Sequence, residues 1–261
     1  MGPLSGQLSP LFSPKISASA AGAFDAMSVA PFELWYDAAQ NENASNVSAT
    51  NGQAVARALN RGSLGGYFTQ TDAGRRATHL AAPPALDFPA SGNGYLTSPV
   101  VALSSQSVLS FFGVIDTTGS SFTDYTPPVL FTRGGAGGIN ATGLSFNGGK
   151  MGFTWNDASE TWGWTGGVTL PSNARCAVAG VIDASGVTAT ATVYCVTSAL
   201  VTTIANTIFP GPQPLSGSGT TWDVGRDPFQ DRHYRGAISH ALLLKGTLTQ
   251  TQIETLAQGL L

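Results

Sequence analysis

The apolar residues of this chain come in short runs that end at glycine- or proline-containing turns, and this pattern constrains the fold most. The central run, residues 108–115 (VLSFFGVI), is apolar throughout, as expected for a strand buried on both faces. Residues 175–182 and 187–196 flank the turn 183–186 (DASG) and are predicted to form a hairpin. Apolar and hydroxyl side chains alternate along 187–193, so we expect one face of that strand to contact water.

A helical pattern is clear in the C-terminal segment. Residues 249–260 (TQTQIETLAQGL) begin with Thr249, a residue type that caps helix N-termini, and they place Ile253, Leu256 and Leu260 at helical spacing. Strands and helices do not alternate along the rest of the chain, which argues against a parallel βαβ sheet. We therefore expect an all-β antiparallel sandwich of about a dozen short strands, followed by one short helix.

The composition fits a single folded domain and excludes several partner classes. Charged residues are only 10% of the 261, well below the roughly 25% of a typical soluble domain, but 42% hydrophobic content argues against disorder. The 12 basic residues are scattered and the net charge is −3, so we expect no nucleic-acid partner. No apolar run approaches the ~20 residues that cross a bilayer, so we expect no membrane insertion.

The N-terminal residues differ in composition from the rest. Residues 1–30 are rich in Ser, Ala, Gly and Pro, and the prolines Pro10 and Pro14 favour extended chain over helix. We predict that 1–30 is an extended arm and that 31–261 is the folded domain. An arm of this kind needs a surface that holds it. A neighbouring subunit is the favoured surface, and the arm's own domain is the alternative.

Several segments resemble a known family. Residues 34–38 (LWYDA) resemble the LWLDA opening of concanavalin A-like (laminin G-like) domains in phage and bacterial surface proteins. Residues 222–226 (WDVGR) and 234–238 (YRGAI) are similar to the closing signature of the same domains. Two positions depart from the pattern, because 59–62 (LNRG) replaces a passage containing tryptophan and aspartate, and His240 replaces an acidic residue. The resemblance implies a jelly-roll sandwich with a short C-terminal helix.

The resemblance spans residues 32–261 and implies the fold more than the activity, because this fold hosts lectins, hydrolases and structural modules. Residues 1–6 lack the features of a secretory signal. We therefore predict a non-enzymatic bacteriophage virion structural protein, a head or tail fibre or decoration subunit on the exterior of the particle. The predicted partners are other virion proteins bound through the 1–30 arm, further copies in a homo-oligomer, and a cell-surface glycan for host adhesion.

Two other functions stay open. A bacterial surface or secreted carbohydrate-binding module would carry a signal sequence or an adjoining catalytic domain. A glycan hydrolase would need paired carboxylates, which hydrolases of this fold arrange as Glu-x-Asp-x-x-Glu. The four glutamates do not form that pattern, and we predict no catalytic residue. They are Glu33, Glu42, Glu160 and Glu254.

Aromatic and amide side chains gather in one predicted turn and suggest a glycan site. Trp162 and Trp164 offer flat indole faces on which the C–H face of a sugar can lie, and Asn156 and Asp157 could orient its hydroxyl groups. The alternative, which we favour, is that the tryptophan pair caps the sandwich.

Three carboxylates in one loop suggest a calcium site. Asp223, Asp227 and Asp231 could supply oxygen ligands to Ca²⁺, which takes several of them. Arg226 and Arg232 could instead neutralise these carboxylates. Solvated turn residues are the favoured interpretation, so we expect no cofactor.

The two cysteines lie in the predicted hairpin. If the turn at 183–186 sets the register, Cys176 and Cys195 fall nearly opposite each other on adjacent strands. A cross-strand disulfide would require a suitable Cα separation. The alternative is two small buried apolar residues.

Overall fold

The computed structural model describes residues 24–88, 94–120, 126–127, 129–132, 140–147, 149–158, 161, 167–215, 219–228 and 232–261. Within these residues all pairings of the named strands are antiparallel, and α1 (Gln250–Leu260) is the one α-helix. The predicted all-β antiparallel class is confirmed. No helix in this part of the chain has the length and apolarity needed to cross a membrane.

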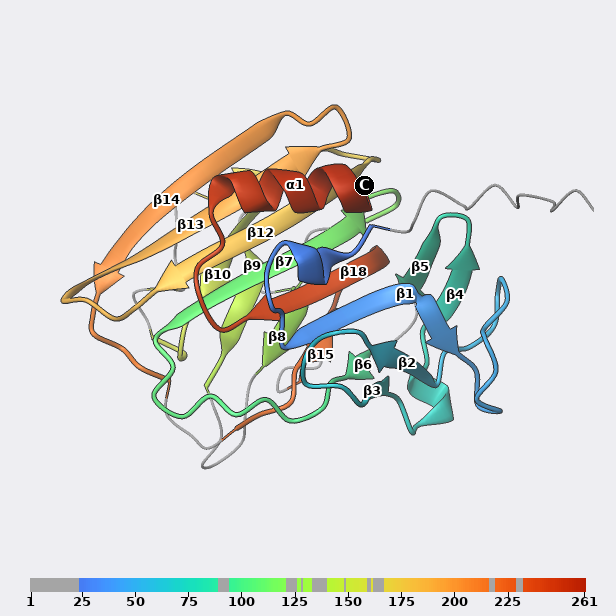
Figure 1. Cartoon of the computed structure of the whole chain (residues 1–261). Helices are drawn as coiled ribbons and strands as arrows, with labels where there is room; N and C mark the ends of the chain where they lie inside the picture. Colours follow the sequence, from blue (N-terminus) through green and yellow to red (C-terminus); the bar gives the residue numbers. More distant parts are fainter. Residues whose placement is uncertain are drawn as a thin grey trace, which may run out of the picture.

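The first layer of the sandwich contains six strands in the order β14-β13-β12-β7-β18-β1 (Figure 1). Their bounds are β1 Leu34–Glu42, β7 Val108–Asp116, β12 Arg175–Asp183, β13 Thr188–Thr197, β14 Thr202–Pro210 and β18 Gly236–Leu244. A further hairpin of β4 (Thr78–Ala81) and β5 (Pro84–Phe88) joins this layer because β5 pairs with β18. The predicted strand at 108–115 and the hairpin at 175–196 are confirmed.

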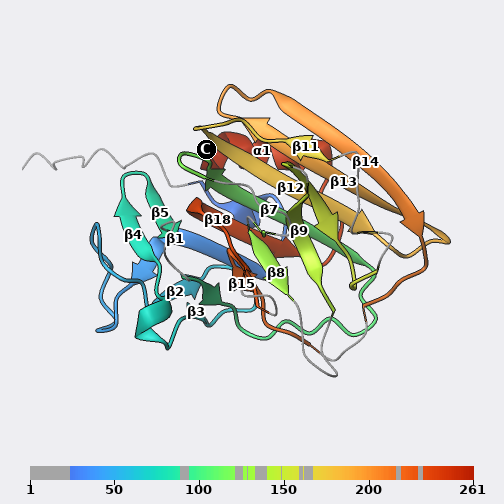
Figure 2. The same ribbon diagram turned by 180° about the vertical axis from the view of Figure 1, so that it is seen from behind.

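The second layer lies behind the first in Figure 1 and in front of it in Figure 2. It continues from β1 in the order β2-β3-β6-β15-β8-β9-β10-β11, so the paired strands curl into a nearly closed sandwich. The bounds are β2 Arg57–Asn60, β3 Tyr67–Thr69, β6 Leu96–Thr97, β8 Leu130–Thr132, β9 Thr142–Asn147, β10 Lys150–Thr154, β11 Val168–Thr169 and β15 Asp223–Val224. Two short strands, β16 (Arg226–Asp227) and β17 (Arg232–His233), pair separately.

The main core fills the space between the two layers. Because side chains alternate along a strand, β7 directs Phe111 and Ile115 inward, where they join Leu144 of β9 in one buried cluster. Gly180 of β12 faces the same side, and a Cβ added there would collide with the side chain of Leu144. The layers are therefore in close contact at this point.

A second buried cluster lies on the outer face of the first layer, under α1. Phe112 of β7 and the small Ala179 of β12 pack against Ile253 and Leu256 of the helix. Thr249 caps the helix in a capping box with Gln252, as the sequence predicted for this N-terminus. Burying each large helix side chain stabilises the packing by about 1.5–3 kcal/mol.

Residues 24–30, which the sequence analysis assigned to the arm, belong to the domain. Ala26 and Ala30 are buried in the cluster under α1, and Val29 accepts a hydrogen bond from Gln252 Nε2 at 3.0 Å. A side chain at Gly259 would collide with the Phe24 ring. In residues 24–30 the chain therefore packs on its own domain, the alternative that the sequence analysis left open. Residues 1–23 lie outside the described residues, and their assembly role stays a prediction.

β14 is the edge strand of the first layer. Within the described residues it pairs on one side only, with β13, and its Ile208 is 72% exposed. An exposed uncharged edge of this length can pair with another chain. The homo-oligomer expected from the sequence stays a prediction.

Candidate functional site

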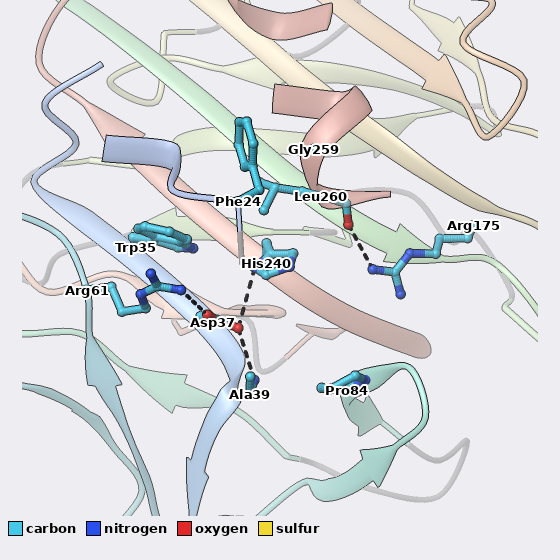
Figure 3. Close-up of a pocket in the computed structure, with 10 residues that line it drawn as sticks. All are labelled: Phe24, Trp35, Asp37, Ala39, Arg61, Pro84, Arg175, His240, Gly259 and Leu260. Carbon is cyan, nitrogen blue, oxygen red and sulfur yellow. Dashed lines mark hydrogen bonds and ion pairs between the residues drawn. The ribbon is translucent and has the colours of Figure 1, made fainter. Parts of the chain in front are cut away.

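A pocket of about 300 Å³ opens on the outer face of the first layer, beside the C-terminal end of α1. Figure 3 shows its walls, with α1 and the N-terminal segment on one side and the β4–β5 turn on the other. Its lining residues are Phe24, Trp35, Asp37, Ala39, Arg61, Pro84, Arg175, His240, Gly259 and Leu260.

Strand alternation in β1 places two of these residues in the pocket wall. Leu34 and Tyr36 face the main core. Successive side chains of a strand point to opposite faces, so Trp35 and Asp37 face outward and line the pocket. The register of β1 and β18 sets Asp37 opposite His240. Local sequence alternation and sheet pairing thus bring a carboxylate, an indole and an imidazole together.

Arg61 joins this group from the loop after β2. Its guanidinium donates to Asp37 Oδ2 at 2.6 Å and stacks over the Trp35 ring, 3.8 Å from the ring centroid. The loop is held in place by Asn60, whose side chain accepts the Trp35 backbone N–H at 2.8 Å. Asp37 also accepts the backbone N–H of Ala39 at 3.0 Å. The Asp37 carboxylate is therefore both paired and hydrogen-bonded.

His240 faces Asp37 without forming a hydrogen bond to it. Its Nδ1 lies 3.7 Å from Asp37 Oδ1, which is too long for a hydrogen bond, and this buried atom has no hydrogen-bond partner in the described structure. Burial lowers the pKa of His240 to about 4. Asp37 opposes that shift, while Arg175 and Arg61 add to it. The imidazole is therefore neutral near pH 7.

Arg175 forms the opposite wall of the pocket. Its guanidinium donates to Ser239 Oγ at 2.9 Å and to the Leu260 carbonyl at 3.0 Å, at the end of α1 where cations are favourable. Its Nε is buried without a hydrogen-bond partner. Burial lowers the pKa of Arg175 and the nearby Asp116 raises it. An arginine with these surroundings keeps its charge at neutral pH.

Three of the residues that line this pocket each have a buried polar atom without a partner. In the described part of the chain five buried side-chain N or O atoms lack hydrogen bonds, and Trp35 Nε1, Arg175 Nε and His240 Nδ1 are among them. Native proteins leave few buried polar groups unsatisfied, because each costs about 1–3 kcal/mol. Indole and guanidinium nitrogens only donate. The pocket is therefore suited to a ligand that presents acceptor oxygens.

The pKa of His240 predicts how stability depends on pH. The folded pKa of about 4 lies below the unfolded value of 6.5, so the unfolded chain binds more protons between these values and stability falls as pH is lowered through this window. We expect His240 to account for about 3 kcal/mol of the loss between pH 7 and pH 4. Urea unfolding of wild type and His240→Gln at both pH values measures it. Equal losses in the two proteins would contradict this assignment.

Of the predicted glycan residues, the structure describes Asn156 and Asp157. Both follow β10 with positive φ angles of 51° and 56°, and Asn156 Oδ1 is buried without a hydrogen bond. Trp162 and Trp164 lie outside the described residues. The site near β10 belongs to the second layer, whereas the pocket lies on the outer face of the first. The glycan role of these four residues stays a prediction.

The predicted calcium ligands have other partners where the structure describes them. Asp223 is 3% exposed, accepts from Thr97 Oγ1 at 2.7 Å and pairs with Arg226. Burial raises its pKa, and Arg226 opposes that shift. Asp227 is also buried, and Asp231 lies outside the described residues. The interpretation of Asp223 and Asp227 as solvated turn residues is therefore wrong. The described residues contain no group of three or more metal-binding side chains.

Cys176 and Cys195 are diagonal neighbours rather than direct partners across the hairpin. Cys176 pairs with Thr197, and Cys195 pairs with Val178. Both thiols are free and buried in the main core. The Cys176 thiol donates a hydrogen bond to the sulfur of Cys195. This bond raises the pKa of Cys176 and lowers the pKa of Cys195.

Comparisons with known proteins connect the fold to glycosidases. No protein-family model and no curated protein match the sequence. A GH54 α-L-arabinofuranosidase soaked with a cyclic sulfate inhibitor is similar with a TM-score of 0.57 and 10% identity, over 88% of this chain and 62% of that one. An arabinofuranosidase complexed with arabinofuranosyl-α-1,2-xylobiose has a TM-score of 0.55 and 12% identity, over 82% of this chain and 52% of that one. A Trypanosoma rangeli sialidase has a TM-score of 0.50 and 13% identity, over 88% of this chain and 33% of that one.

These similarities show the fold, and they correct the predicted function. The chain spans less than two thirds of the length of each of these proteins. The prediction of a non-enzymatic bacteriophage virion protein is contradicted, because the similar structures named above are glycosidases. The sandwich is compatible with a lectin-like domain, as the resemblance implied.

Sequence reasoning missed the pocket. It noted His240 only as a departure from the family pattern and did not connect it with Trp35 and Asp37 of one strand or with Arg61 and Arg175, which lie in two other segments. One signal was present, since Arg61 and His240 stand at the two places where the chain departs from the family pattern.

Proposed function

We propose that this chain is a carbohydrate-binding β-sandwich module of the concanavalin A-like, jelly-roll type, and that the pocket beside α1 is its binding site. The observation that carries the proposal is that three residues of one pocket, Trp35, Arg175 and His240, each have a buried nitrogen without a hydrogen-bond partner in the described structure. A sugar suits them because its hydroxyl and ring oxygens accept hydrogen bonds. This is the carbohydrate-binding alternative, on the surface of a cell or secreted, rather than a virion protein.

The rest of the pocket wall fits the apolar side of a sugar. Phe24, Pro84 and Leu260 line it together with the polar group. Figure 3 shows Phe24 and Leu260 on one side of His240 and Pro84 on the other. Ligand pockets combine such apolar walls with a few placed polar groups. A volume of about 300 Å³ is at the small end for ligand pockets, which favours a single sugar unit.

A second candidate function is glycoside hydrolysis, and one arrangement of carboxylates favours it. Asp87 and Asp116 both pair with Ala237, from opposite sides of β18. With strands about 4.8 Å apart, their Cα atoms are about 10 Å from each other. Two side chains on the same face can bring their carboxyl groups from there to the separation of about 6.5–9.5 Å that inverting glycosidases use. Burial raises the pKa of Asp87, as a general acid requires.

Blocking the mouth of the pocket tests the binding proposal. Ala39 is exposed and lines the pocket, so Ala39→Trp should fill it without entering the core. We expect the wild type to bind sugars from a panel of neutral and acidic monosaccharides in calorimetric titrations, and Ala39→Trp to lose at least about tenfold in affinity, or 1.4 kcal/mol. Ala44→Trp, at an exposed position outside the pocket, is the matched control.

A hydrolysis assay on the wild type and on Asp87→Asn separates binding from hydrolysis. If the wild type releases nitrophenol from 4-nitrophenyl glycosides and Asp87→Asn does not, hydrolysis becomes the leading function. If sugars bind and no glycoside is cleaved, the module only binds. Sugar affinity that is equal in wild type, Ala39→Trp and Ala44→Trp would place the binding site elsewhere and overturn the proposal.

A further inference from the structure

The charged side chains of the pocket do not balance. Arg61 and Arg175 are cations and Asp37 is an anion, while His240 is neutral near pH 7. The described wall therefore carries one excess positive charge. A buried excess charge is unfavourable until an opposite charge compensates it.

Arg175 is the cation without a counterion in contact. Arg61 is paired with Asp37 at 2.6 Å, whereas Arg175 forms no ion pair in the described structure and donates only to the neutral oxygens of Ser239 and Leu260. Asp116 lies next to Arg175 across β12 and β7 and favours its charge from a distance, but no ion pair joins the two side chains in the described structure. The guanidinium keeps its buried Nε–H free to donate.

We infer that the ligand of this pocket is a sugar acid, whose carboxylate binds the Arg175 guanidinium. The inference rests on the proposed function and names the class of sugar. One carboxylate compensates one excess positive charge. A phosphate or sulfate ester adds a bulkier tetrahedral group to a small pocket, and a phosphate adds more negative charge than the wall can balance. Guanidinium groups match the planar carboxylate in geometry as well as charge.

The remaining walls agree with an acidic monosaccharide rather than a simple anion. Phe24, Pro84 and Leu260 give the pocket apolar surface that a carboxylate alone would leave uncovered. Asp37 cannot repel the ligand strongly, because Arg61 and the Ala39 backbone N–H already occupy its oxygens. The pocket can therefore bind the acidic group on the Arg175 side and the ring against the apolar wall.

Calorimetric titration with matched sugars tests the inference. The probes are D-galacturonate and D-glucuronate, compared with D-galactose and D-glucose at pH 7 and low salt. A charge-assisted hydrogen bond predicts that the uronates bind about 10- to 100-fold more tightly than the neutral sugars. We expect this advantage to shrink at high salt and to vanish in Arg175→Gln.

Two further variants separate recognition from folding. Arg235→Gln removes an exposed arginine outside the pocket and should leave the uronate preference unchanged. Arg175→Lys keeps the charge but lacks the guanidinium, so its preference should be intermediate. Thermal melting checks that the Arg175 variants remain folded, and the salt dependence of the uronate preference in the wild type provides an independent test in case they do not.

Each outcome has a distinct meaning. Neutral sugars that bind as tightly as uronates would overturn the inference and leave the proposed function standing. A uronate preference that survives in Arg175→Gln, or that does not shrink at high salt in the wild type, would also overturn it. Displacement of the uronate by acetate or sulfate at equal concentration would show a general anion site rather than a sugar-acid site. If no sugar binds, the proposed function fails together with the inference.

Discussion

Trp35→Ala should lower the free energy of unfolding by about 3–5 kcal/mol and abolish sugar binding. Trp35 is 1% exposed and packs in the cluster under α1 with Phe112 and Leu242. Its ring also carries the Arg61 guanidinium on one face, at 3.8 Å. Removing the indole therefore opens a cavity and releases Arg61 from its position beside Asp37. Urea unfolding measures the first effect, and calorimetric titration with the sugar panel measures the second.

Trp35→Phe separates the packing of the ring from its N–H group. Phenylalanine keeps an aromatic face under Arg61 and removes the unpartnered Nε1 donor. We expect it to retain most of the stability that Trp35→Ala loses, while its sugar affinity falls by about tenfold, as for the loss of one hydrogen bond. If Trp35→Phe bound sugars as tightly as the wild type, the indole N–H would have no part in recognition.

Gly180→Val should destabilise the sandwich by about 3 kcal/mol, because it overpacks the contact between the layers. The first atom of a side chain at Gly180 would already collide with Leu144. Both residues lie in paired, buried strands, so neither backbone can move away without disturbing its neighbours. The midpoint of urea unfolding measures the loss. Gly74→Val is the control, since a Cβ at Gly74 meets only Asp72 Oδ1 at 3.4 Å.

A double variant tests whether the collision is the cause. Leu144→Ala alone should cost about 2–5 kcal/mol through the cavity that it leaves. Combined with Gly180→Val, it provides the space that the valine needs, so the double variant should be more stable than the sum of the two losses predicts, by at least about 0.5 kcal/mol. Simple additivity would show that the two side chains do not meet.

The sequence predicted the elements whose pattern is set by local spacing. The apolar run of β7, the hairpin of β12 and β13, and the capped helix α1 each follow from periodicity and turn residues alone. The alternation along β13 also matches its burial, with Thr188 and Thr190 exposed and Ala189 and Ala191 buried. These features depend on neighbours in sequence, so one chain is enough to predict them.

The pocket could not be predicted in the same way, because sheet register creates it. Asp37 and His240 are opposite each other only because β1 pairs with β18, the first long strand with the last. Arg175 reaches the site through β12 and the end of α1. The departures from the family pattern at Arg61 and His240 marked two of the residues, but nothing in the sequence showed that they meet.

Burial decided the other corrections. Asp223 and Asp227 have the composition of a solvated turn, yet they are buried, and Asp223 is held by Arg226 and Thr97. The segment 24–30 was predicted to be part of an extended arm held by a neighbouring subunit, but its small and apolar residues pack beside α1 of its own domain. Low charge and many hydroxyl groups suit a virion protein and a secreted sugar-binding module equally well, so composition could not separate them.

The most direct test of the proposed site follows the indole N–H signals by NMR during a sugar titration. The chain has five tryptophans, and Trp35→Phe identifies the Trp35 signal by its loss. A site beside α1 predicts that the Trp35 indole signal shifts on addition of D-galacturonate, while the core residues Trp155 and Trp222 stay unchanged. Shifts confined to Trp162 or Trp164, with Trp35 unmoved, would place binding at the turn after β10 and contradict the account.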